Sequence, residues 1–352
     1  MRRGKKTSNE SKAKLTPESY QKYFEAFELE MEAERKIELK RFAANPILKP
    51  IPENYWECFE TFNAGAIVLD KKVHLFYRAV GNDWTSRIGY ASSKDGFLID
   101  CREKRPVLEY PCEENIEECK VKSSPGLNFY GIEDPRVTRV ENEEKVYLTF
   151  TTLTPTALRI GLTSIPVKSI LKKSWDFSKI KLISLPNVNN KNWVIFPEKI
   201  NGKYVILTKI SPIITLKYLD SIDKIEYIES DGIVNGTGFV DWSKRLKGAG
   251  APPIKTEDGW LLFFHALNKK GLYSIGACLL ECKDPTIVNY VSKAPVLEPK
   301  EKYETSGIKP NIVYSCGAVI KNDLLLVYYG ASDTTLCVAY SYLDEFLSKL
   351  TS

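Results

Sequence analysis

The chain has 352 residues, of which 43% are hydrophobic, so it can bury the core of one large all-β domain or of two ordinary domains. The formal net charge of +5 is small beside the 45 acidic residues, which excludes a general nucleic-acid-binding protein. No apolar run is long enough to span a bilayer, and none follows the basic N-terminus as it would in a signal peptide. We therefore expect no nucleic-acid partner, no membrane partner and a cytoplasmic location.

The eight cysteines are scattered along the chain. They form no CxxC pair and no Cys/His cluster with zinc spacing. Cys278 and Cys282 are four residues apart, but no second ligand pair follows them. The pattern indicates reduced thiols and no metal site, as in a cytoplasmic protein.

Residues 1–45 differ in composition from the rest of the chain. Up to Lys14 they are polar and basic, and we expect disorder there. From Thr16 to about Ala44 the apolar residues recur at helical spacing, and Thr16 followed by Pro17 is a typical helix start. This segment predicts a helix that either packs on the flank of the main domain or joins two copies in a homo-oligomer. The apolar residues of this helix are Tyr20, Tyr23, Phe24, Phe27, Met31 and Leu39.

Residues 46–352 read as strands and contain a repeat. Each unit has a short apolar strand, a turn, an aromatic-rich strand and a third strand. Asn201-Gly202 and Asp258-Gly259 are hairpin turns of two units, a strong signal between apolar runs. The spacing of roughly 50 to 70 residues suits a propeller blade with its loops. We predict an all-β, five-bladed β-propeller, because a β-sandwich does not require the same pattern five times. The units open at Asn63, Glu133, Phe196, Gly250 and Ser315.

Polar side chains occur at the same two places in the repeat. In a hairpin, the start of one strand lies beside the end of the next, so these side chains gather at one end of every blade. Asp134 alone is no more than a turn residue, since Asp before Pro is common in turns. Nine polar groups together favour a site for a carbohydrate and an anion over a protein-binding surface. The strand openers are Asn63, Asp134, Asn192 and Lys247, and the closers are Arg78, Thr152, Lys209, His265 and Asp333.

Several motifs, in order and spacing from about Asn45 to about Tyr340, resemble those of glycoside hydrolase family 130. The resemblance implies a five-bladed propeller that acts on β-mannosides, as an inverting phosphorylase or, in one branch, as a hydrolase. The motifs are Gly131-Ile132-Glu133-Asp134-Pro135-Arg136, the segment 191–204, Gly248-Ala249-Gly250-Ala251-Pro252-Pro253-Ile254, the segment 259–265 and Tyr328-Tyr329-Gly330-Ala331-Ser332-Asp333-Thr334.

The resemblance also implies residue roles. Asp134 would be the general acid and would protonate the leaving oxygen through the mannose 3-hydroxyl. The mannose ring would be held by Asn63, Arg78, Glu304 and Asp333. Phosphate, the co-substrate of an enzyme without a further cofactor, would be held by Lys191, Asn192, Lys209, Lys247 and His265.

The chemistry of the cluster favours a phosphorylase. An inverting hydrolase needs a second carboxylate to activate water, whereas a phosphorylase needs cations to hold the phosphate in line. Lys191 and Lys209 stand where arginine is common in the family, and lysine lacks the two-pronged grip of arginine. Both could instead be solvated surface lysines, and His265 could be a buried core histidine. The alternatives are an inverting β-mannosidase, a mannosyltransferase and a non-catalytic glycan-binding propeller.

Overall fold

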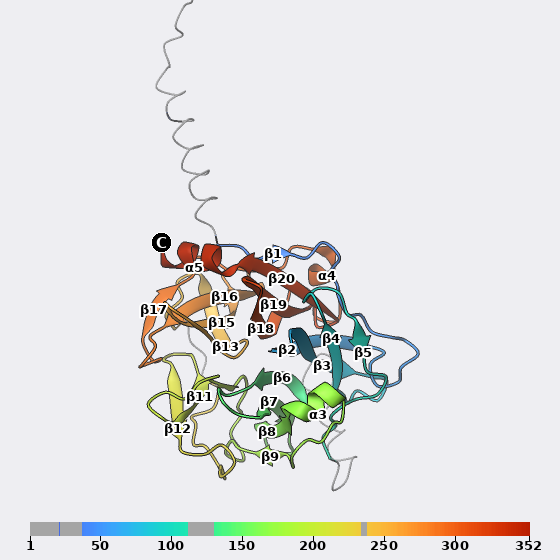
Figure 1. The fold of residues 1–352 in the computed structure, drawn as a ribbon. Coiled ribbons are helices and arrows are strands. Elements are labelled where there is room, and N and C mark those ends of the chain that lie inside the picture. Colours follow the sequence, from blue (N-terminus) through green and yellow to red (C-terminus); the bar gives the residue numbers. More distant parts are fainter. Residues whose placement is uncertain (1–20, 22–36, 112–129, 234–237) are drawn as a thin grey trace, which may run out of the picture. The chain divides into compact units, whose positions relative to one another are not determined.

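The computed structural model describes Gln21 and residues 37–111, 130–233 and 238–352. Residues 37–351 form one compact unit, in which five antiparallel sheets surround a central channel (Figure 1). The predicted all-β, five-bladed propeller is confirmed. The first strands of the sheets and the loops beside them supply many of the residues that line the two cavities along the channel.

The first three blades follow the chain in order. Blade 1 consists of β2 (Glu60–Leu69), β3 (Lys72–Val80), β4 (Ser86–Ser93) and β5 (Cys101–Arg102). Blade 2 consists of β6 (Glu133–Thr138), β7 (Lys145–Leu153), β8 (Leu158–Pro166) and β9 (Lys181–Leu182), with the helix α3 (Val167–Lys172) after β8. Blade 3 consists of β10 (Val194–Ile195), β11 (Tyr204–Lys209) and β12 (Thr215–Leu219).

The last two blades have irregular edges. In blade 4, β13 (Ser243–Ala249) and β14 (Ile254–Thr256) both pair with β15 (Gly259–Asn268), which is followed by β16 (Tyr273–Leu280) and β17 (Val288–Val291). Blade 5 consists of β18 (Val313–Lys321), β19 (Leu324–Ala331), β20 (Thr335–Tyr342) and β1 (Lys40–Arg41). The helix α4 (Lys302–Thr305) precedes β18, and α5 (Leu343–Thr351) follows β20.

Three hairpin turns have the geometry of a two-residue turn, whereas in the predicted Asp258-Gly259 turn Gly259 is already the first residue of β15 and pairs with Thr256. Asn201 and Gly202 both have positive φ, as do Asp70 with Lys71 and Asn322 with Asp323. Two successive residues with positive φ define the type I′ turn, whose twist matches that of the flanking strands. Asn, Asp and Gly adopt this backbone conformation more readily than other residues.

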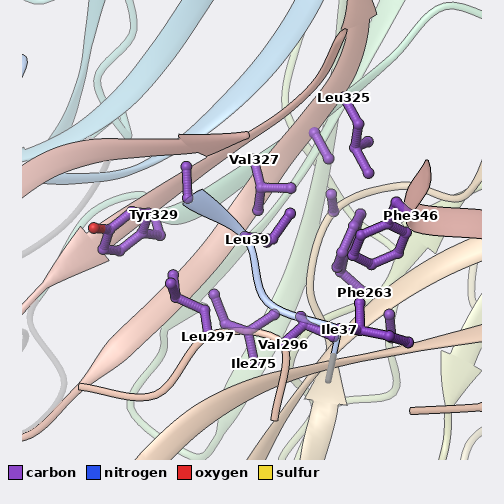
Figure 2. Packing of buried hydrophobic residues seen from close by; sticks show 14 of the residues in the cluster. Ile37, Leu39, Phe263, Ile275, Val296, Leu297, Leu325, Val327, Tyr329 and Phe346 are labelled. Carbon is purple, nitrogen blue, oxygen red and sulfur yellow. The ribbon is translucent and has the colours of Figure 1, made fainter. Parts of the chain in front are cut away.

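The N-terminal segment closes the ring instead of continuing as a helix. Ile37 and Leu39 are buried in the core between blades 4 and 5, among side chains of β15, β16 and β19 (Figure 2). Lys40 and Arg41 pair with β20. The predicted helix to Ala44 and the domain start at residue 46 are therefore wrong for residues 37–45, because pairing with β20 holds this segment extended. The rest of the predicted helix and the predicted disordered tail lie outside the described residues.

The described residues contain no helix that is long and apolar enough to cross a membrane. The same residues contain no group of three His, Cys, Asp or Glu side chains that could hold a metal ion.

Candidate active site

A cavity of about 320 Å³ lies at one end of the channel and receives side chains from all five blades. Its charged and amide side chains come mainly from the predicted strand openers and closers. The described residues that line it are Asn63, Arg78, Glu133, Asp134, Lys191, Asn192, Ile233, Leu246, Lys247, Tyr273, Lys309, Ile312, Tyr314 and Asp333.

Irregular backbone directs the polar side chains into this cavity. Asn63, Asp134, Asn192 and Asp333 all have positive φ, between 46° and 64°. Asn63 and Asp134 also lie within β-bulges, where the register shifts between Phe62 and Gly65 and between Glu133 and Arg136. A bulge adds a residue and re-aims its side chain, and Asn and Asp tolerate the left-handed conformation. Asp134, expected in a turn, is instead a buried residue of β6.

Glycines of the neighbouring blades leave room for two of these side chains. A Cβ on Gly330 would lie 2.1 Å from Oδ1 of Asn63. A Cβ on Gly248, whose φ is 145°, would lie 2.3 Å from Nδ2 of Asn192. Both distances are shorter than a van der Waals contact, so these two amides depend on glycine in the adjacent blade.

One side of the cavity, which we call the paired wall, consists of Asn63, Arg78, Asp134, Lys309 and Asp333. Asn63 Nδ2 donates to Asp134 Oδ1 at 2.9 Å, and Arg78 Nη1 donates to the same oxygen at 3.1 Å. Lys309 Nζ lies 2.8 Å from Asp333 Oδ2. Each carboxylate of this wall therefore has a cation beside it.

The opposite side, the lysine wall, consists of Lys191, Asn192 and Lys247. Glu133 joins the two walls, because its carboxylate lies 3.3 Å from Arg78 Nη2 and 3.6 Å from Lys191 Nζ. Lys247 has no carboxylate within ion-pair distance among the described residues. Burial, and then Arg245 and Lys191, lower the pKa of Lys247. Lys191 thus shares Glu133 with Arg78, and the charge of Lys247 is offset by no acid within ion-pair distance among the described residues.

A side chamber of about 30 Å³ opens behind the lysine wall and shares Lys191, Asn192 and Lys247 with the cavity. Lys209 lines only this chamber, and its Nζ lies 2.7 Å from Asp231 Oδ2 at the surface. The chamber admits about two or three water molecules, since a water needs roughly 10–15 Å³.

The charge of Asp134 depends on its neighbours. Burial alone would raise the pKa of this carboxyl, but Arg78, Arg136, Lys191 and the hydrogen bond from Asn63 outweigh burial. Together they hold the pKa of Asp134 well below its ordinary range. Asp134 is therefore ionised in the ligand-free site, and it can act as an acid only after a ligand raises its pKa.

The family to which the chain belongs follows from comparison with known proteins. The model of glycoside hydrolase family 130, described as beta-1,4-mannooligosaccharide phosphorylase, matches residues 35–352. The chain belongs to glycoside hydrolase family 130. The predicted resemblance is thereby confirmed.

Individual relatives agree with this assignment. A beta-1,2-mannobiose phosphorylase of Thermoanaerobacter sp. (strain X514) is 37% identical over 86% of this chain and 96% of its own length. A 1,2-beta-oligomannan phosphorylase of the same strain is 35% identical over 86% of this chain and 97% of its own length. The solved beta-1,2-mannobiose phosphorylase of Listeria innocua superposes with a TM-score of 0.68 at 25% identity, and the match covers 89% of this chain and 99% of that one.

Among the predicted residues of this family 130 chain, seven line the cavity and Lys209 lines the side chamber. His265 lines neither. Its ring is fully buried, stacks on Tyr314 with centroids 3.7 Å apart, and places Nε2 beside the backbone of Ser315. Burial and Arg136 lower the pKa of His265 to about 3, so it is neutral. A neutral, buried ring agrees with the alternative of a core histidine and supplies no cation in the ligand-free site, and the predicted contact of His265 with phosphate stays a prediction.

Glu304 is also placed elsewhere. Its side chain is fully buried in α4, where Oε1 accepts from Arg41 Nε at 2.8 Å and from the Tyr329 hydroxyl at 2.8 Å. The backbone amides of Lys300 and Glu301 donate to Oε2. Glu304 therefore fastens β1 to α4 and β19 and is not among the described residues that line the cavity; its predicted contact with mannose stays a prediction.

Four polar cavity residues were not predicted. Glu133 precedes Asp134 and could have been found from that motif. Lys309, Tyr273 and Tyr314 lie in no motif that we identified, and the packing of blades 4 and 5 brings them to the cavity.

Proposed function

We propose that this enzyme cleaves β-mannosides by phosphorolysis with inversion and releases α-mannose 1-phosphate. The observation that carries the proposal is the lysine wall, where Lys247 has no acidic partner among the described residues, in the same cavity as Asp134. Relatives named as mannoside phosphorylases support it. Inorganic phosphate would be the second substrate.

In this proposal the mannose lies against the paired wall. A sugar hydroxyl both donates and accepts, so it suits the neutral amide of Asn63 and the charged groups of Arg78 and Asp333, which already have partners of opposite charge. Mannose carries no charge and needs directed hydrogen bonds, which charged partners make roughly twice as strong as neutral ones.

Phosphate would bind between the lysine wall and the mannose. The main cavity offers about 320 Å³ against about 30 Å³ in the side chamber, so the phosphate would occupy the main cavity beside Lys191, Asn192 and Lys247. Cations there would neutralise the anion and hold one oxygen in line with the anomeric carbon. Lys209 lines only the side chamber, so its charge would attract the phosphate without direct contact.

The proton balance is consistent with an ionised Asp134. Phosphate beside Lys191 brings negative charge near the carboxylate and so raises its pKa. A monoanionic phosphate can thus pass its proton to Asp134, which protonates the leaving oxygen, through the mannose 3-hydroxyl as the family resemblance implies. The C1–O bond to the leaving sugar breaks, the C1–O bond to phosphate forms, and Asp134 returns to its ionised form.

Hydrolysis is the less favoured reaction at this site. An inverting hydrolase needs a carboxylate that is free to activate water. Glu133 is held by Arg78 and Lys191, and Asp333 is held by Lys309. Both carboxylates are therefore engaged in ion pairs and are not free to activate water.

The deciding experiment is incubation with a panel of mannobioses and mannosylglucose, with and without inorganic phosphate. We propose β-1,2-linked mannosides as the first substrates, because relatives named for that linkage are 33–37% identical, against 28% for one named for the β-1,4 linkage. We expect mannose 1-phosphate to form only with phosphate, as the α-anomer by NMR. Release of free mannose in phosphate-free buffer would contradict the proposal.

A further inference from the structure

Arg136 is a deeply buried charge next to the cavity, with about 1% of its surface exposed. Among the described residues it has no carboxylate within ion-pair distance, and it is not one of the residues that line the cavity. Transfer of an unpaired guanidinium from water into the protein is unfavourable, so its hydrogen bonds must compensate for lost hydration.

These hydrogen bonds reach four blades. Within blade 2, Nη1 donates to the backbone oxygen of Asp134 at 2.8 Å. Nη2 donates to Asn192 Oδ1 in blade 3 at 2.9 Å and to the Tyr314 hydroxyl in blade 5 at 3.1 Å. Nε donates to the backbone oxygen of Gly250 in blade 4 at 2.9 Å, and Nη2 also lies 3.3 Å from that of Ala249.

Three of these partners, Asp134, Asn192 and Tyr314, line the cavity, and the first two belong to different walls. Asp134 carries the proposed acid and has a φ of 52°, a backbone conformation that persists only when its surroundings hold it. Asn192 belongs to the lysine wall and also accepts from the Tyr314 hydroxyl at 2.7 Å. The rigid, planar guanidinium of Arg136 therefore links the backbone of Asp134 to the side-chain amide of Asn192 on the lysine wall.

We propose that Arg136 is a positioning residue that fixes the Asp134 carboxylate relative to the phosphate site, and that it thereby sets the geometry of the reaction. The inference rests on the proposed function. Arg136 acts through Asp134 and Asn192 and touches neither substrate. Five donors in a fixed plane suit this role, and a lysine amine cannot reproduce it.

The test compares Arg136→Met and Arg136→Lys with the matched control Arg159→Met. Arg159 is also buried in blade 2 and is also bound by backbone oxygens, those of Ser184 and Leu182, but it does not contact the cavity. We expect Arg136→Met to lower kcat about 100-fold, as a misplaced catalytic group does, with little change in KM for the mannoside. Arg136→Lys should recover only part of this loss, and Arg159→Met should keep kcat near the wild-type value.

The pH profile separates positioning from a general loss of stability. Loss of the Arg136 charge raises the pKa of Asp134 in the ligand-bound enzyme, so the pH above which kcat falls should move upward; a purely structural defect lowers kcat equally at every pH. The other groups that influence Asp134 remain in the variant: Arg78, Lys191, Asn63, Tyr273, Tyr314, Cys316 and His265.

If Arg136→Met does not fold, Tyr314→Phe removes only the hydroxyl that joins Arg136 to Asn192, and it should lower kcat several-fold. An unchanged kcat in the folded variants, or a loss matched by Arg159→Met without a shifted pH profile, would overturn the role of Arg136. A wild-type enzyme that cleaves no mannoside in the panel would overturn the proposed function and this role with it.

Discussion

Both walls of the cavity carry cations, but they differ in how these charges are balanced. On the paired wall, Arg78 lies beside Asp134 and Lys309 lies beside Asp333. On the lysine wall, Lys191 shares Glu133 with Arg78, and Lys247 has no acidic partner among the described residues. A balanced wall suits a neutral sugar, whereas an unbalanced one suits an anion.

The difference also explains why one cavity can serve two substrates. An ion pair that is already satisfied presents fixed hydrogen-bonding groups and attracts no counter-ion. An unpaired, half-buried lysine gains from any anion that replaces its lost hydration. Each wall can therefore be changed separately, and the following predictions test this independence.

The largest effect is expected from Asp134→Asn. Asn keeps the size of the side chain and tolerates positive φ, but it cannot donate the proton, so kcat should fall about 10²- to 10⁴-fold. The melting temperature should also fall, because Asp134 is buried and paired with Arg78. Turnover near the wild-type rate would remove Asp134 from the mechanism, and phosphate affinity measured by calorimetry serves as the control for the lysine wall.

The second-largest effects are expected from Lys247→Met on one wall and Lys309→Met on the other. Lys247→Met should raise KM for phosphate about 10- to 100-fold, the value of one charged hydrogen bond, and leave KM for the mannoside nearly unchanged. Lys309→Met leaves Asp333 unpaired on the other wall. This variant should raise KM for the mannoside and leave KM for phosphate nearly unchanged. Increasing salt should weaken phosphate binding in the wild type. Equal effects of both variants on both substrates would show that the walls do not act separately.

The third effect concerns Glu60, a buried residue of β2 close to the paired wall. Burial raises the pKa of Glu60 to about 8, while Arg78 opposes the rise. The folded state therefore holds a proton that the unfolded chain has lost, and stability falls as pH rises from about 4.5 to 8. Glu60→Gln keeps the group neutral, so its melting temperature should exceed that of the wild type by a few degrees at pH 9 and equal it near pH 4. The same difference in melting temperature between Glu60→Gln and the wild type at every pH from 4 to 9 would contradict the prediction.

Most of the fold could be predicted because its signals are local. The turn at Asn201-Gly202 and the strand-opening Asn63 and Asp134 fix backbone conformations that few other residues adopt. The end of the N-terminal segment could not be predicted this way. The spacing of Leu39 fits a helix, and only the distant strand β20 and the core of blades 4 and 5 hold the segment extended.

The candidate site was predicted in part for a related reason. Strand position indicates which end of a blade a residue occupies, but not which face its side chain takes. The bulge between Leu246 and Gly248 shifts the register opposite His265, whose ring turns into the core. Lys309 and Tyr273 reach the cavity from loop and strand positions whose direction depends on packing between blades. Such contacts leave no signal in the local sequence.

The smallest effect is expected where the lysine wall meets the surface. Lys209 is held by the exposed Asp231 at 2.7 Å and lies behind the wall, so its charge reaches a bound phosphate only in part. Lys209→Ala should raise KM for phosphate about two- to fivefold, in keeping with the small free energy of exposed ion pairs. Asp231→Asn should lower it by a similar factor, because it releases the Lys209 charge toward the cavity.

The two variants also decide how phosphate is held. If Lys209 contacts the anion directly, Lys209→Ala should raise KM for phosphate as much as Lys247→Met does. Lys209→Arg should then bind phosphate better than the wild type through its two-pronged grip. If Lys209 acts only from behind the wall, the arginine variant should match the wild type, and the double variant of Lys209→Ala with Asp231→Asn should match Lys209→Ala alone. Phosphate saturation curves at constant mannoside distinguish these outcomes, and KM for the mannoside should stay constant throughout.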